Sequence, residues 1–523
     1  MRFAFDTETV RAVEAELLDQ QRRPDELMGL AARAVAATAE VLATSQNTKG
    51  IHILVGPGGN GGDGLFAGAL LALNGYSVTA LLATPKHHED GLAAFQATGG
   101  KLTEEAELND ETAVLIDAVA GLGGARGLEG TAWETYQQAR KQQVPILAVD
   151  LPTGIDADTG EADDTAVFAT ATITFGYARA GHLFAPECGQ VIVADLKLPT
   201  NPKSFAEALE AHEPAGRIAY EEAIESPYAW SEHPVLDSPE GYVSALRPVG
   251  GVGAITDPVP GIFSDKYSGG VVGLCAGSKV YPGAGILSAR AAVRATPSMV
   301  RFIGDDSITH HLPEIVVHPS VAEAGRVQAW VFGPGRGTDD NAKAELAELL
   351  KRPEPVLIDA DGITLLANHA DLREAVRKHP AVVLTPHGGE FARLYEAGIG
   401  KQPDPRATAL PELAAKLQCV ILLKGRITTI AGPNSVPASV DAGHSFAATP
   451  GSGDVLSGIC GALLAQLAAH NEPSEADIVD ELLRAVSLHA HAAAIAAQTP
   501  EGYGICSAAQ IADALPTAIA RLR

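Results

Sequence analysis

The sequence contains few cysteines. Five occur among 523 residues, and none belongs to a CxxC motif or has the Cys/His spacing of a zinc site. The sequence therefore has neither a disulfide framework nor a structural zinc motif. We expect the cysteines to be small apolar side chains in the core of a protein from a reducing compartment. They are Cys188, Cys275, Cys419, Cys460 and Cys506.

Signals for export or membrane insertion are also missing. Residues 1–10 contain two acidic side chains and no apolar run, unlike a signal peptide. No stretch of about 18 uncharged apolar residues occurs, which a membrane-spanning helix would need. We therefore expect a cytoplasmic protein without a membrane partner.

Positive charge is scarce. The chain has 38 Lys and Arg against 64 Asp and Glu, a formal net charge of −26. Nucleic acid is therefore not an expected partner, because affinity for its phosphate backbone comes mainly from Lys and Arg. Small anions remain possible ligands, since backbone N–H groups in a Gly-rich loop or at a helix N-terminus can hold a phosphate.

The composition is that of a folded protein with more than one domain. Hydrophobic residues make up 46% and charged residues 20% of the chain, and the mean hydropathy is +0.08, which excludes a disordered protein. At roughly 150 residues per domain, the length predicts two to four domains.

Apolar strands alternate with Ala- and Leu-rich helices along the first 200 residues. Two helices are predicted within residues 5–45, and strands follow. Such alternation predicts βαβ units and a mostly parallel sheet covered on both faces. The predicted strands are Ile51–Val55, Ser77–Ala83, Ala113–Ile116, Pro145–Val149, Ala171–Phe175 and Val191–Ala194.

Between about residues 200 and 264 this pattern stops. Prolines recur there and Gly250–Gly253 form a glycine-rich patch, so we expect a linker or domain edge. A second alternating series follows without detectable similarity to the first, so the chain is a fusion of two α/β domains, residues 1–212 and 213–523. The second series of strands is Gly270–Leu274, Met299–Ile303, Ala329–Phe332, Pro355–Ile358, Ala381–Leu384 and Val420–Leu423.

A glycine-rich segment, GPGGNGGDG at Gly56–Gly64, follows the first predicted strand and leads into the helix predicted over Leu65–Leu73. Its glycines allow backbone N–H groups to approach a phosphate at the helix N-terminus. The segment also fits G-x-G-x-x-G. However, the next strand ends at Ala83-Thr84 without the acidic residue that binds ribose, which disfavours an ordinary redox Rossmann domain.

Two aspartates follow later strands of this domain. Asp117 opens DAVAGLGGARG and Asp150 opens DLPTGID. A single carboxylate in such a position is more often a helix cap or a loop hydrogen-bond acceptor. Because parallel strands place their carboxyl ends at one edge of the sheet, we expect Asn60, Asp117 and Asp150 to converge on one crevice.

These three motifs together resemble the NAD(P)HX epimerase family. That family has roughly GxGNNGGDG, D-A-x-x-G-T-G and V-D-I-P-S-G-x-D, and this chain has GPGGNGGDG, DAVAGLGG and VDLPTGID in the same order, within about residues 10–200. The resemblance implies a Rossmann-like domain. It departs from the family where Gly59 replaces Asn, Leu122 replaces Thr and Thr153 replaces Ser.

The resemblance also implies roles for single residues. Asp150 would lie beside the hydrated nicotinamide ring as the acid or base. A potassium ion would bind Asn60, Asp117 and Thr153, whose hard oxygen donors suit such a cation. The implied substrate-binding residues are Gly59, Asn60, Gly61, Gly62 and Asp63, together with Gly121, Leu122, Gly123, Gly124, Ala125, Arg126 and Gly127.

A second motif, TPGSGDVLSGICGALLAQ at Thr449–Gln466, has small residues leading into an apolar helix with Asp454 in its first turn. Gly451 and Gly453 free backbone N–H groups to form an anion hole for a transferred phosphoryl group. The carboxylate of Asp454 could accept a hydroxyl proton as the oxygen attacks phosphorus. Taken alone, the motif would equally fit a simple helix cap.

Four further motifs precede it in order: GPGRG at Gly333–Gly337, DADGI at Asp359–Ile363, LTPHGGEFARL at Leu384–Leu394 and LLKGRIT at Leu422–Thr428. With the opening stretch Asp265–Arg294 they resemble the ribokinase-like NAD(P)HX dehydratase domain over about residues 262–515. The departures from that pattern are Gly388 in place of Pro, Arg426-Ile427 in place of the small pair of KGAGT, and Pro450.

This second resemblance implies a dinucleotide site and a nucleotide site. Asp454 would be the catalytic base. A lone histidine such as His387 is more often structural, but within TPHGGE we expect it to contact substrate. The hydrated dinucleotide would contact Ala284, Gly335 and His387, and the adenine nucleotide would contact Lys424, Gly425, Arg426, Ile427, Thr428 and Gly453.

Together the two resemblances imply a bifunctional repair enzyme for NADHX and NADPHX, the hydrated forms of NADH and NADPH. The first domain would interconvert the R and S epimers. The second would phosphorylate the ring hydroxyl of the S form with ADP and Mg²⁺, in preference to ATP, and then expel phosphate. We also expect a homo-oligomer.

Other functions stay open from the sequence. The second half could be a ribokinase-like small-molecule kinase fused to a nucleotide-binding domain, because the same Gly-flanked aspartate serves such kinases. A non-catalytic nucleotide sensor is another class. The first half could be an inactive partner domain, given Gly59 and Leu122.

Overall fold

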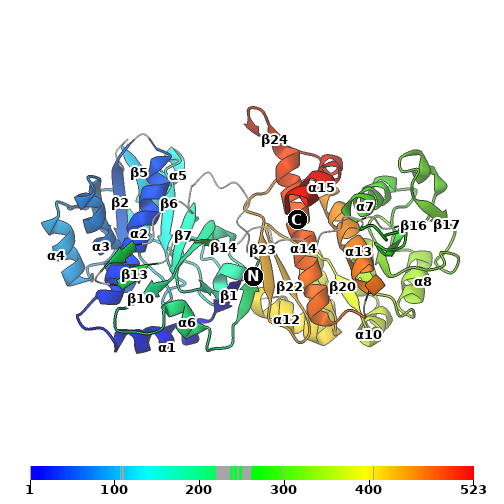
Figure 1. Ribbon diagram of the computed structural model, residues 1–523, viewed down its shortest axis with the longest axis horizontal. Helices are drawn as coiled ribbons and strands as arrows, with labels where there is room; N and C mark the ends of the chain where they lie inside the picture. The colour runs from blue at the N-terminus through cyan, green and yellow to red at the C-terminus, as the bar shows by residue number, and fades with distance from the viewer. Residues whose placement is uncertain are drawn as a thin grey trace. The chain divides into compact units, whose positions relative to one another are not determined.

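The chain forms two compact α/β units, shown by the computed structural model in Figure 1. Unit 1 comprises residues 1–218 and 225–250, and unit 2 comprises residues 219–224 and 251–523. The expected α/β class is confirmed. The described residues are 2–46, 48–106, 108, 111–219, 236–238, 241–243, 247–249, 261–296, 299–403, 406–470 and 472–522.

The domain boundary expected after residue 212 stays a prediction. Much of the stretch expected to be a linker, residues 200–264, lies outside the described residues, and so does the patch Gly250–Gly253. Within that stretch the structure describes short elements that belong to unit 1. They are α6 (Phe205–Leu209), β11 (Gly216–Ile218), β12 (Leu236–Ser238), β13 (Gly241–Val243) and β14 (Arg247–Val249).

Unit 1 is built on an eight-stranded sheet with the order β14-β9-β7-β6-β5-β2-β3-β4. Neighbours run parallel, as expected, except that β14 pairs antiparallel with β9. The other strands are β2 (Gly50–Val55), β3 (Ser77–Leu82), β4 (Lys101–Thr103), β5 (Thr112–Ala118), β6 (Ile146–Val149), β7 (Ala171–Phe175) and β9 (Gln190–Ala194).

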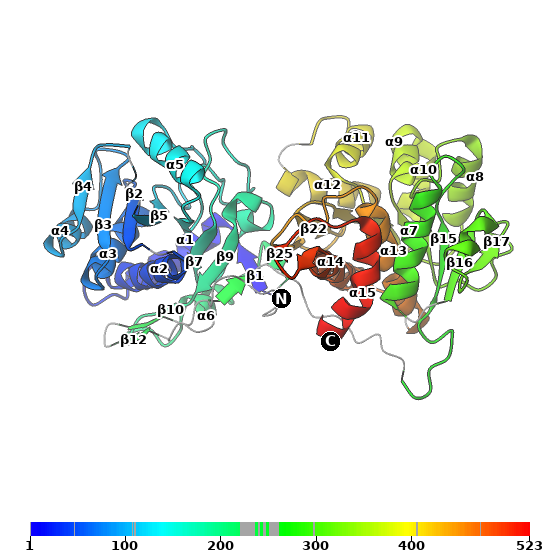
Figure 2. The ribbon, with the colours of Figure 1, turned by 90° about the horizontal axis from the view of Figure 1, so that it is seen from above.

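Helices cover both faces of this sheet (Figure 2). In β2, Ile53 packs into one apolar cluster and Leu54 into the other, because successive strand residues point to opposite faces. The first face carries α1 (Thr7–Leu18), α2 (Glu26–Thr44), α3 (Gly59–Leu73), α4 (Glu89–Ala97) and α6, and the second carries α5 (Gly130–Gln142).

Two glycines let α3 pack closely on the sheet. A Cβ at Gly64 would lie 2.5 Å from Ala118 Cβ, and one at Gly68 would lie 2.7 Å from Ile53 Cδ1. A larger residue at either position would push the helix away from β2 and β5. The helix N-terminus is thereby held against the carboxyl ends of these strands.

The remaining elements of unit 1 are short. β1 (Arg2–Phe5) pairs antiparallel with β11 and parallel with β8 (Ala178–Arg179), and β10 (Leu196–Lys197) and β12 both pair with β13. Two 3₁₀ helices, Ala180–Leu183 and Pro186–Cys188, follow β8. The sequence pattern did not predict these elements, because they are too short to show a period.

Unit 2 has a sheet with the order β17-β16-β15-β18-β19-β20-β21-β22-β23. The strands from β17 to β21 run parallel, and the last two pairings are antiparallel. The strands are β15 (Val271–Cys275), β16 (Met299–Ile303), β17 (Val316–His318), β18 (Ala329–Phe332), β19 (Val356–Ile358), β20 (Val382–Leu384), β21 (Val420–Leu423), β22 (Ile427–Ala431) and β23 (Ala438–Asp441).

Two groups of helices enclose the sheet of unit 2. One apolar cluster joins the sheet to α7 (Pro282–Ala295), α13 (Ser452–His470), α14 (Glu475–Ala497) and α15 (Ala508–Leu522). The other joins it to α8 (Asp340–Leu349), α9 (Asp361–Asn368), α10 (Ala370–Lys378), α11 (Gly388–Ile399) and α12 (Arg406–Leu417). A short helix, Asp306–His310, and a hairpin of β24 (Gln498–Thr499) and β25 (Gly502–Tyr503) complete the unit.

Two helices, α2 and α13, are long and apolar enough to cross a membrane by length and composition alone. Most residues of both are buried within their own unit, so they serve here as core helices.

The cysteines also follow expectation, since four are buried and Cys506 is half-buried.

Two candidate active sites

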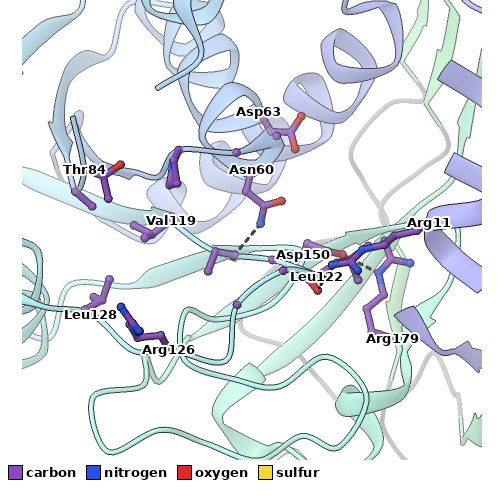
Figure 3. Close-up of a pocket in the computed structure, with 18 of the residues that line it drawn as sticks. Arg11, Asn60, Asp63, Thr84, Val119, Leu122, Arg126, Leu128, Asp150 and Arg179 are labelled. Atoms are coloured by element: carbon purple, nitrogen blue, oxygen red, sulfur yellow. Dashed lines mark hydrogen bonds and ion pairs between the residues drawn. The ribbon is translucent and has the colours of Figure 1, made fainter. Parts of the chain in front are cut away.

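The first site lies at the carboxyl edge of the unit 1 sheet. A cavity of about 680 Å³ opens there, lined by segments that follow β2, β5 and β6 and by α1 (Figure 3). Of the residues expected to bind substrate, those lining the cavity are Gly59, Asn60, Asp63, Gly121, Leu122, Gly123, Gly124, Arg126 and Gly127. Gly61, Gly62 and Ala125 are not among the described lining residues.

From Gly59 onward the glycine-rich segment is helical rather than a loop. α3 begins at Gly59 and not at Leu65 as the sequence predicted, so Gly59–Asp63 form its first turns. Glycine is required here because the backbone packs too closely for a side chain. A Cβ at Gly61 would clash with Gly56 O, and one at Gly56 would clash with Val119 O. Glycine helix propensity is poor, which is why the sequence suggested a later start.

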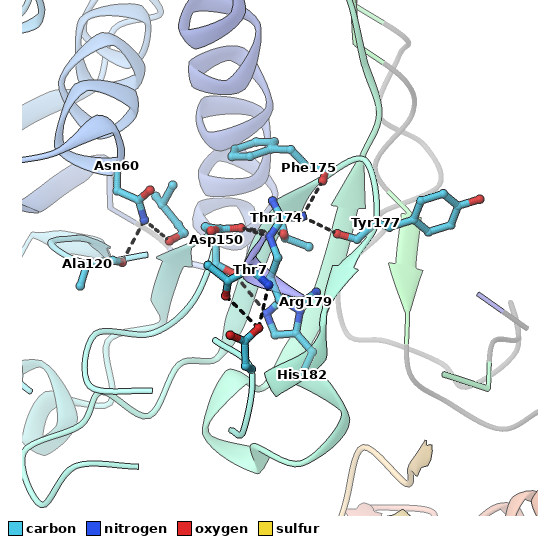
Figure 4. Close-up of polar contacts among 11 residues, drawn as sticks. Thr7, Asn60, Ala120, Asp150, Thr174, Phe175, Tyr177, Arg179 and His182 are labelled. Atoms are coloured by element: carbon cyan, nitrogen blue, oxygen red, sulfur yellow. Dashed lines mark hydrogen bonds and ion pairs between the residues drawn. The ribbon is translucent and has the colours of Figure 1, made fainter. Parts of the chain in front are cut away.

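Asn60 connects this helix to the ends of two strands. Its Nδ2 donates to the carbonyl oxygens of Ala120 (2.9 Å) and Val149 (2.7 Å) (Figure 4). A Cβ at Gly121 would clash with the Asn60 amide, so the loop after β5 also packs against it. Of the three residues expected to converge on one crevice, Asn60 and Asp150 line the cavity, whereas the buried Asp117 is not among its described lining residues.

Asp117 is buried and accepts three hydrogen bonds. Its carboxylate accepts from Thr153 N (2.8 Å), Thr153 Oγ1 (2.7 Å) and Val119 N (3.3 Å), and Thr153 Oγ1 accepts from Ala120 N (3.1 Å). Burial raises the pKa of Asp117 to about 6, although these hydrogen bonds favour its charged form. Asp117 therefore holds the loop after β6 against the loop after β5.

Asp150 is held by residues that the sequence analysis did not identify. Its backbone has φ of 67°, an uncommon conformation for a non-glycine residue that often occurs at functional sites. Oδ1 accepts from Thr174 Oγ1 (2.9 Å) and Arg179 Nε (2.9 Å). Arg179 also donates to two nearby carbonyl oxygens, those of Phe175 and Tyr177 (Figure 4).

His182 contacts the backbone carbonyl of Asp150. The Nε2 atom of His182 lies 3.1 Å from Asp150 O, and its Nδ1 accepts from Arg179 N at 2.9 Å. Burial lowers the pKa of His182 to about 4, so the ring is neutral and donates to the carbonyl of Asp150. Thr174, Arg179 and His182 lie 24–32 residues beyond Asp150, and no local spacing in the sequence marks them.

Among the other carboxyl residues that line the cavity, Asp63 and Glu14 have raised pKa values. Burial raises the pKa of Asp63 well above its ordinary value, and the charges of Glu14 and Asp150 raise it further. Burial also raises the pKa of Glu14, against the opposing effect of Arg179. These two carboxyl groups therefore hold a proton more readily than they would in water, which suits the cavity to acid–base chemistry.

The second site lies at the carboxyl edge of the unit 2 sheet, at the N-terminus of α13. Gly451 has φ of 85°, a conformation suited to glycine, and begins the turn that leads to Asp454. Ser452 Oγ lies 3.0 Å from Nε2 of the buried His489. Burial raises the pKa of Asp454 to about 6; the charges of Asp359 and Asp361 add to this and that of Lys424 opposes it.

The residues expected to contact the dinucleotide come from neighbouring segments. Gly335 has φ of 59°, and a Cβ on it would lie 2.8 Å from Ala284 Cβ, so these two residues are adjacent. His387 caps α11, its Nδ1 accepting from Gly389 N at 3.0 Å. His387 also forms a β-bridge with Lys424, which brings the TPHGGE and KGRIT motifs together.

The KGRIT motif divides into an accessible part and a buried part. Ile427 and Thr428 are buried in β22, and their expected contact with the adenine nucleotide stays a prediction. Nε of Arg426 lies 3.4 Å from Asp441 Oδ1, so this side chain is paired within the protein. Lys424 and Gly425 remain at the edge.

Arg406 is a neighbour of this edge that the motifs did not reveal. A Cβ at Gly388 would lie 3.6 Å from its Nη2, and one at Gly425 would lie 3.9 Å from its Nη1. The guanidinium therefore lies near both the TPHGGE and the KGRIT segments. A basic residue at the start of α12 gives no signal in the sequence, because only the fold brings it to this edge.

Comparisons with known proteins match each unit to a family. A family model described as NAD(P)H-hydrate dehydratase matches residues 272–517, and one described as YjeF-related protein N-terminus matches residues 24–181. A relative from Corynebacterium glutamicum, described as a bifunctional NAD(P)H-hydrate repair enzyme, is 40% identical and covers 100% of this chain and 99% of its own. One from Mycobacterium leprae with the same description is 37% identical over all of both chains.

A solved structure is similar to part of the chain. The ADP/ATP-dependent NAD(P)H-hydrate dehydratase from Bacillus subtilis, crystallised with ATP and Mg²⁺, is 26% identical. It covers 52% of this chain and 95% of its own, with a TM-score of 0.43.

Proposed function

The chain belongs to the family of bifunctional NAD(P)H-hydrate repair enzymes, and we propose on this premise that each of its units performs one step of the repair. Unit 1 interconverts the R and S epimers of NADHX and NADPHX. Unit 2 dehydrates the S epimer to NADH or NADPH at the expense of a nucleotide. The two sites lie in a single cytoplasmic protein.

The observation that carries the proposal for unit 2 is the position of Asp454. This carboxyl group stands in the first turn of α13, after a glycine turn and within range of the charges of Lys424 and Asp359. Backbone N–H groups at such a turn stabilise charge on a phosphoryl group in transfer. A base with a pKa of about 6 is ionised at neutral pH and accepts a hydroxyl proton readily.

The dehydration then proceeds in two steps. Asp454 takes the proton of the C6 hydroxyl as that oxygen forms a bond to the terminal phosphorus of the nucleotide, and the shorter nucleotide leaves. The C6–O bond next breaks, phosphate departs, a proton leaves C5 and the ring double bond returns. ADP is our first choice of donor, and Mg²⁺ would neutralise charge on its phosphates.

Epimerisation is assigned to Asp150 in unit 1. The Arg179 guanidinium and the Thr174 hydroxyl hold its carboxylate at the cavity wall, so its position is fixed before substrate arrives. We assign to it the proton transfer at the C6 hydroxyl group. In-line phosphoryl transfer accepts only one epimer. The other epimer must therefore be converted to it before dehydration.

Potassium fits unit 1 by the chemistry of the available donors. Asn60, Asp117 and Thr153 are joined through Ala120 by hydrogen bonds and offer hard oxygen donors, which suit an alkali cation. Potassium held by these three residues would offset the negative charge of Asp117 and of the dinucleotide phosphates. The residues themselves keep the loops after β5 and β6 in place.

The test is recovery of reduced coenzyme. Purified protein is mixed with both NADHX epimers and either ADP or ATP, and the absorbance of reduced nicotinamide is followed together with inorganic phosphate. We expect complete recovery of both epimers with release of phosphate. A stable phosphate ester would instead identify unit 2 as a kinase, and binding without turnover would identify a sensor.

A further inference from the structure

One buried carboxylate joins the segments that form the second site. Asp359 follows β19, and its side chain is 2% exposed. Oδ1 accepts from Lys424 Nζ at 2.7 Å, and Oδ2 accepts from Ser457 Oγ at 2.6 Å. Lys424 follows β21, whereas Ser457 lies on α13 one turn after Gly453. Asp359 thus connects two strand ends with the helix that carries Asp454.

The Lys424 ammonium lies against the glycine turn. A Cβ at Gly453 would lie 3.3 Å from Lys424 Nζ, so the charge stands next to the residue that precedes Asp454. The Lys424 side chain is 19% exposed, and among the described residues Asp359 is the acceptor bonded to it. An ammonium has three donors, so it can bind phosphate oxygens while it keeps this bond.

Lysine would not hold this position unaided. Its four-carbon side chain is flexible and its ammonium is a compact, strongly hydrated charge. Burial opposes its charge, yet the Asp359 carboxylate, with weaker help from Glu390 and Asp454, raises the pKa of Lys424 above its ordinary value. Asp359 thus fixes both the place and the charge of the ammonium.

We propose that Asp359 is a positioning residue for phosphoryl transfer: through Lys424 it places a positive charge beside the turn that carries Asp454, where the terminal phosphate of the nucleotide binds. This assignment rests on the proposed dehydratase function. The resemblance to the dehydratase domain implies no role for Asp359. Ser457 completes the arrangement by tying the same carboxylate to α13.

Asp359→Asn in the full chain is the first test. The amide keeps the size of the side chain and removes the charge that holds Lys424. We expect kcat for S-NADHX dehydration to fall about 10–100-fold, since small misplacements cost this much, with little change in the KM for S-NADHX. The acid limb of the kcat profile should move to lower pH, because Asp359 raises the pKa of Asp454.

The matched control is Asp371→Asn. Asp371 also pairs with a lysine, Lys343, at 3.1 Å, but this pair lies on the exposed surface of unit 2 and the Asp371 side chain is 66% exposed. We expect this variant to keep the parent kcat and pH profile. Equal losses in both variants would mean that carboxylate removal acts through stability, which would overturn the positioning role.

A double substitution shows whether Asp359 acts through Lys424. If it does, Asp359→Asn combined with Lys424→Met should lose no more kcat than Lys424→Met alone, because coupled residues are non-additive. Losses that multiply would contradict the proposal.

A measurement independent of turnover separates this inference from the proposed function. Acylation of Lys424 by acetic anhydride across pH, followed by mass spectrometry, reports the protonation of its ammonium. We expect reaction at lower pH in Asp359→Asn than in the parent protein, and an unchanged profile would overturn the inference even in an active enzyme. Failure of the parent protein to restore coenzyme would refute the proposed function, whereas the acylation result would still decide whether Asp359 controls Lys424.

Discussion

Both units place a buried aspartate after a strand and pair it with a basic side chain, yet the two pairs differ in role. In unit 1, Asp150 with Arg179 lines the cavity and is itself assigned the proton transfer. In unit 2, Asp359 with Lys424 supports a different carboxyl group, Asp454, on the helix. The comparison teaches that a similar ion pair can carry the reacting group or only orient its neighbours.

The pairs also differ in the exposure of their basic side chains, although both carboxylates are buried. The Arg179 and Asp150 side chains are 3% and 6% exposed, whereas Lys424 is 19% exposed. Arg179 also donates to two backbone carbonyls. We therefore regard the unit 1 pair as fixed before substrate binds, and the unit 2 pair as open on one side to a phosphate.

The largest expected effect distinguishes Asp454, the proposed base, from Asp359, the proposed positioning residue. Asp454→Asn should lower kcat for S-NADHX by about 10²–10⁴-fold, the usual contribution of a general base. Asp359→Asn should lose less. Rapid-mixing kinetics with ADP compares the kcat of the two variants. A smaller loss in Asp454→Asn than in Asp359→Asn would contradict the assignment of Asp454 as the base.

The next effect concerns stability. Arg179→Met leaves the Asp150 carboxylate buried without its cation, which costs about 3–5 kcal/mol of the free energy of unfolding. Lys424→Met also leaves a buried carboxylate, that of Asp359, without its cation. The Lys424 side chain is 19% exposed, so water can replace the ammonium, and we expect a smaller cost of about 1–3 kcal/mol. Denaturant unfolding of both variants, followed separately for each unit by hydrogen exchange, makes the comparison. Equal costs would show that exposure does not distinguish the pairs.

A smaller loss is expected from the glycine turn of unit 1. Gly56→Ala forces a Cβ against the backbone of Val119 and should cost about 1–3 kcal/mol, with a parallel loss of epimerisation. The control is Gly29→Ala in α2, outside the cavity lining, where an added Cβ meets no atom within 4 Å. Dehydration of pure S-NADHX should be normal in both variants, and its loss in Gly56→Ala would show that the units do not function separately.

The smallest effect follows from proton linkage at Asp454. Its pKa is raised to about 6 in the folded protein, so the folded state binds the proton more tightly than the unfolded state. Stability from this group is therefore present at low pH and declines as pH rises from about 4 to 6. Activity runs oppositely, since the base must be ionised, with an acid limb near pH 6.

Asp454→Asn tests this linkage. The neutral amide should raise the melting temperature at pH 7 by about 1–3 °C and make it less dependent on pH between 4 and 6. Differential scanning calorimetry at several pH values measures both. A lower melting temperature in the variant would show that the ionised carboxylate stabilises the fold.

The comparison also shows what the sequence could predict. All twelve predicted strands exist with bounds shifted by at most two residues, because buried parallel strands are continuous apolar runs between glycines and helices. The short strands β1, β8 and β10 have no such run. The early start of α3 at Gly59 was missed because packing on β2 and β5 outweighs poor helix propensity.

Some residues of the candidate sites could be predicted from the sequence, and others could not. Motifs identified Asp150, Asp454 and Lys424 because the residues around each are local in sequence. Their partners Arg179 and Asp359 lie 29 and 65 residues from Asp150 and Lys424, and only the fold brings them into contact. Asp359 stood within a motif, but nothing in the spacing showed which lysine it would hold.

The central claim is that the two units carry two separable reactions, and one measurement tests it most directly. Asp150→Asn and Asp454→Asn are each incubated with a mixture of NADHX epimers and ADP, and both epimers and NADH are resolved over time. The account predicts that Asp150→Asn converts all of the S form and leaves R to its spontaneous rate, whereas Asp454→Asn equilibrates the epimers and forms no NADH. Rapid consumption of R by Asp150→Asn, or NADH formation at the parent rate by Asp454→Asn, would contradict it.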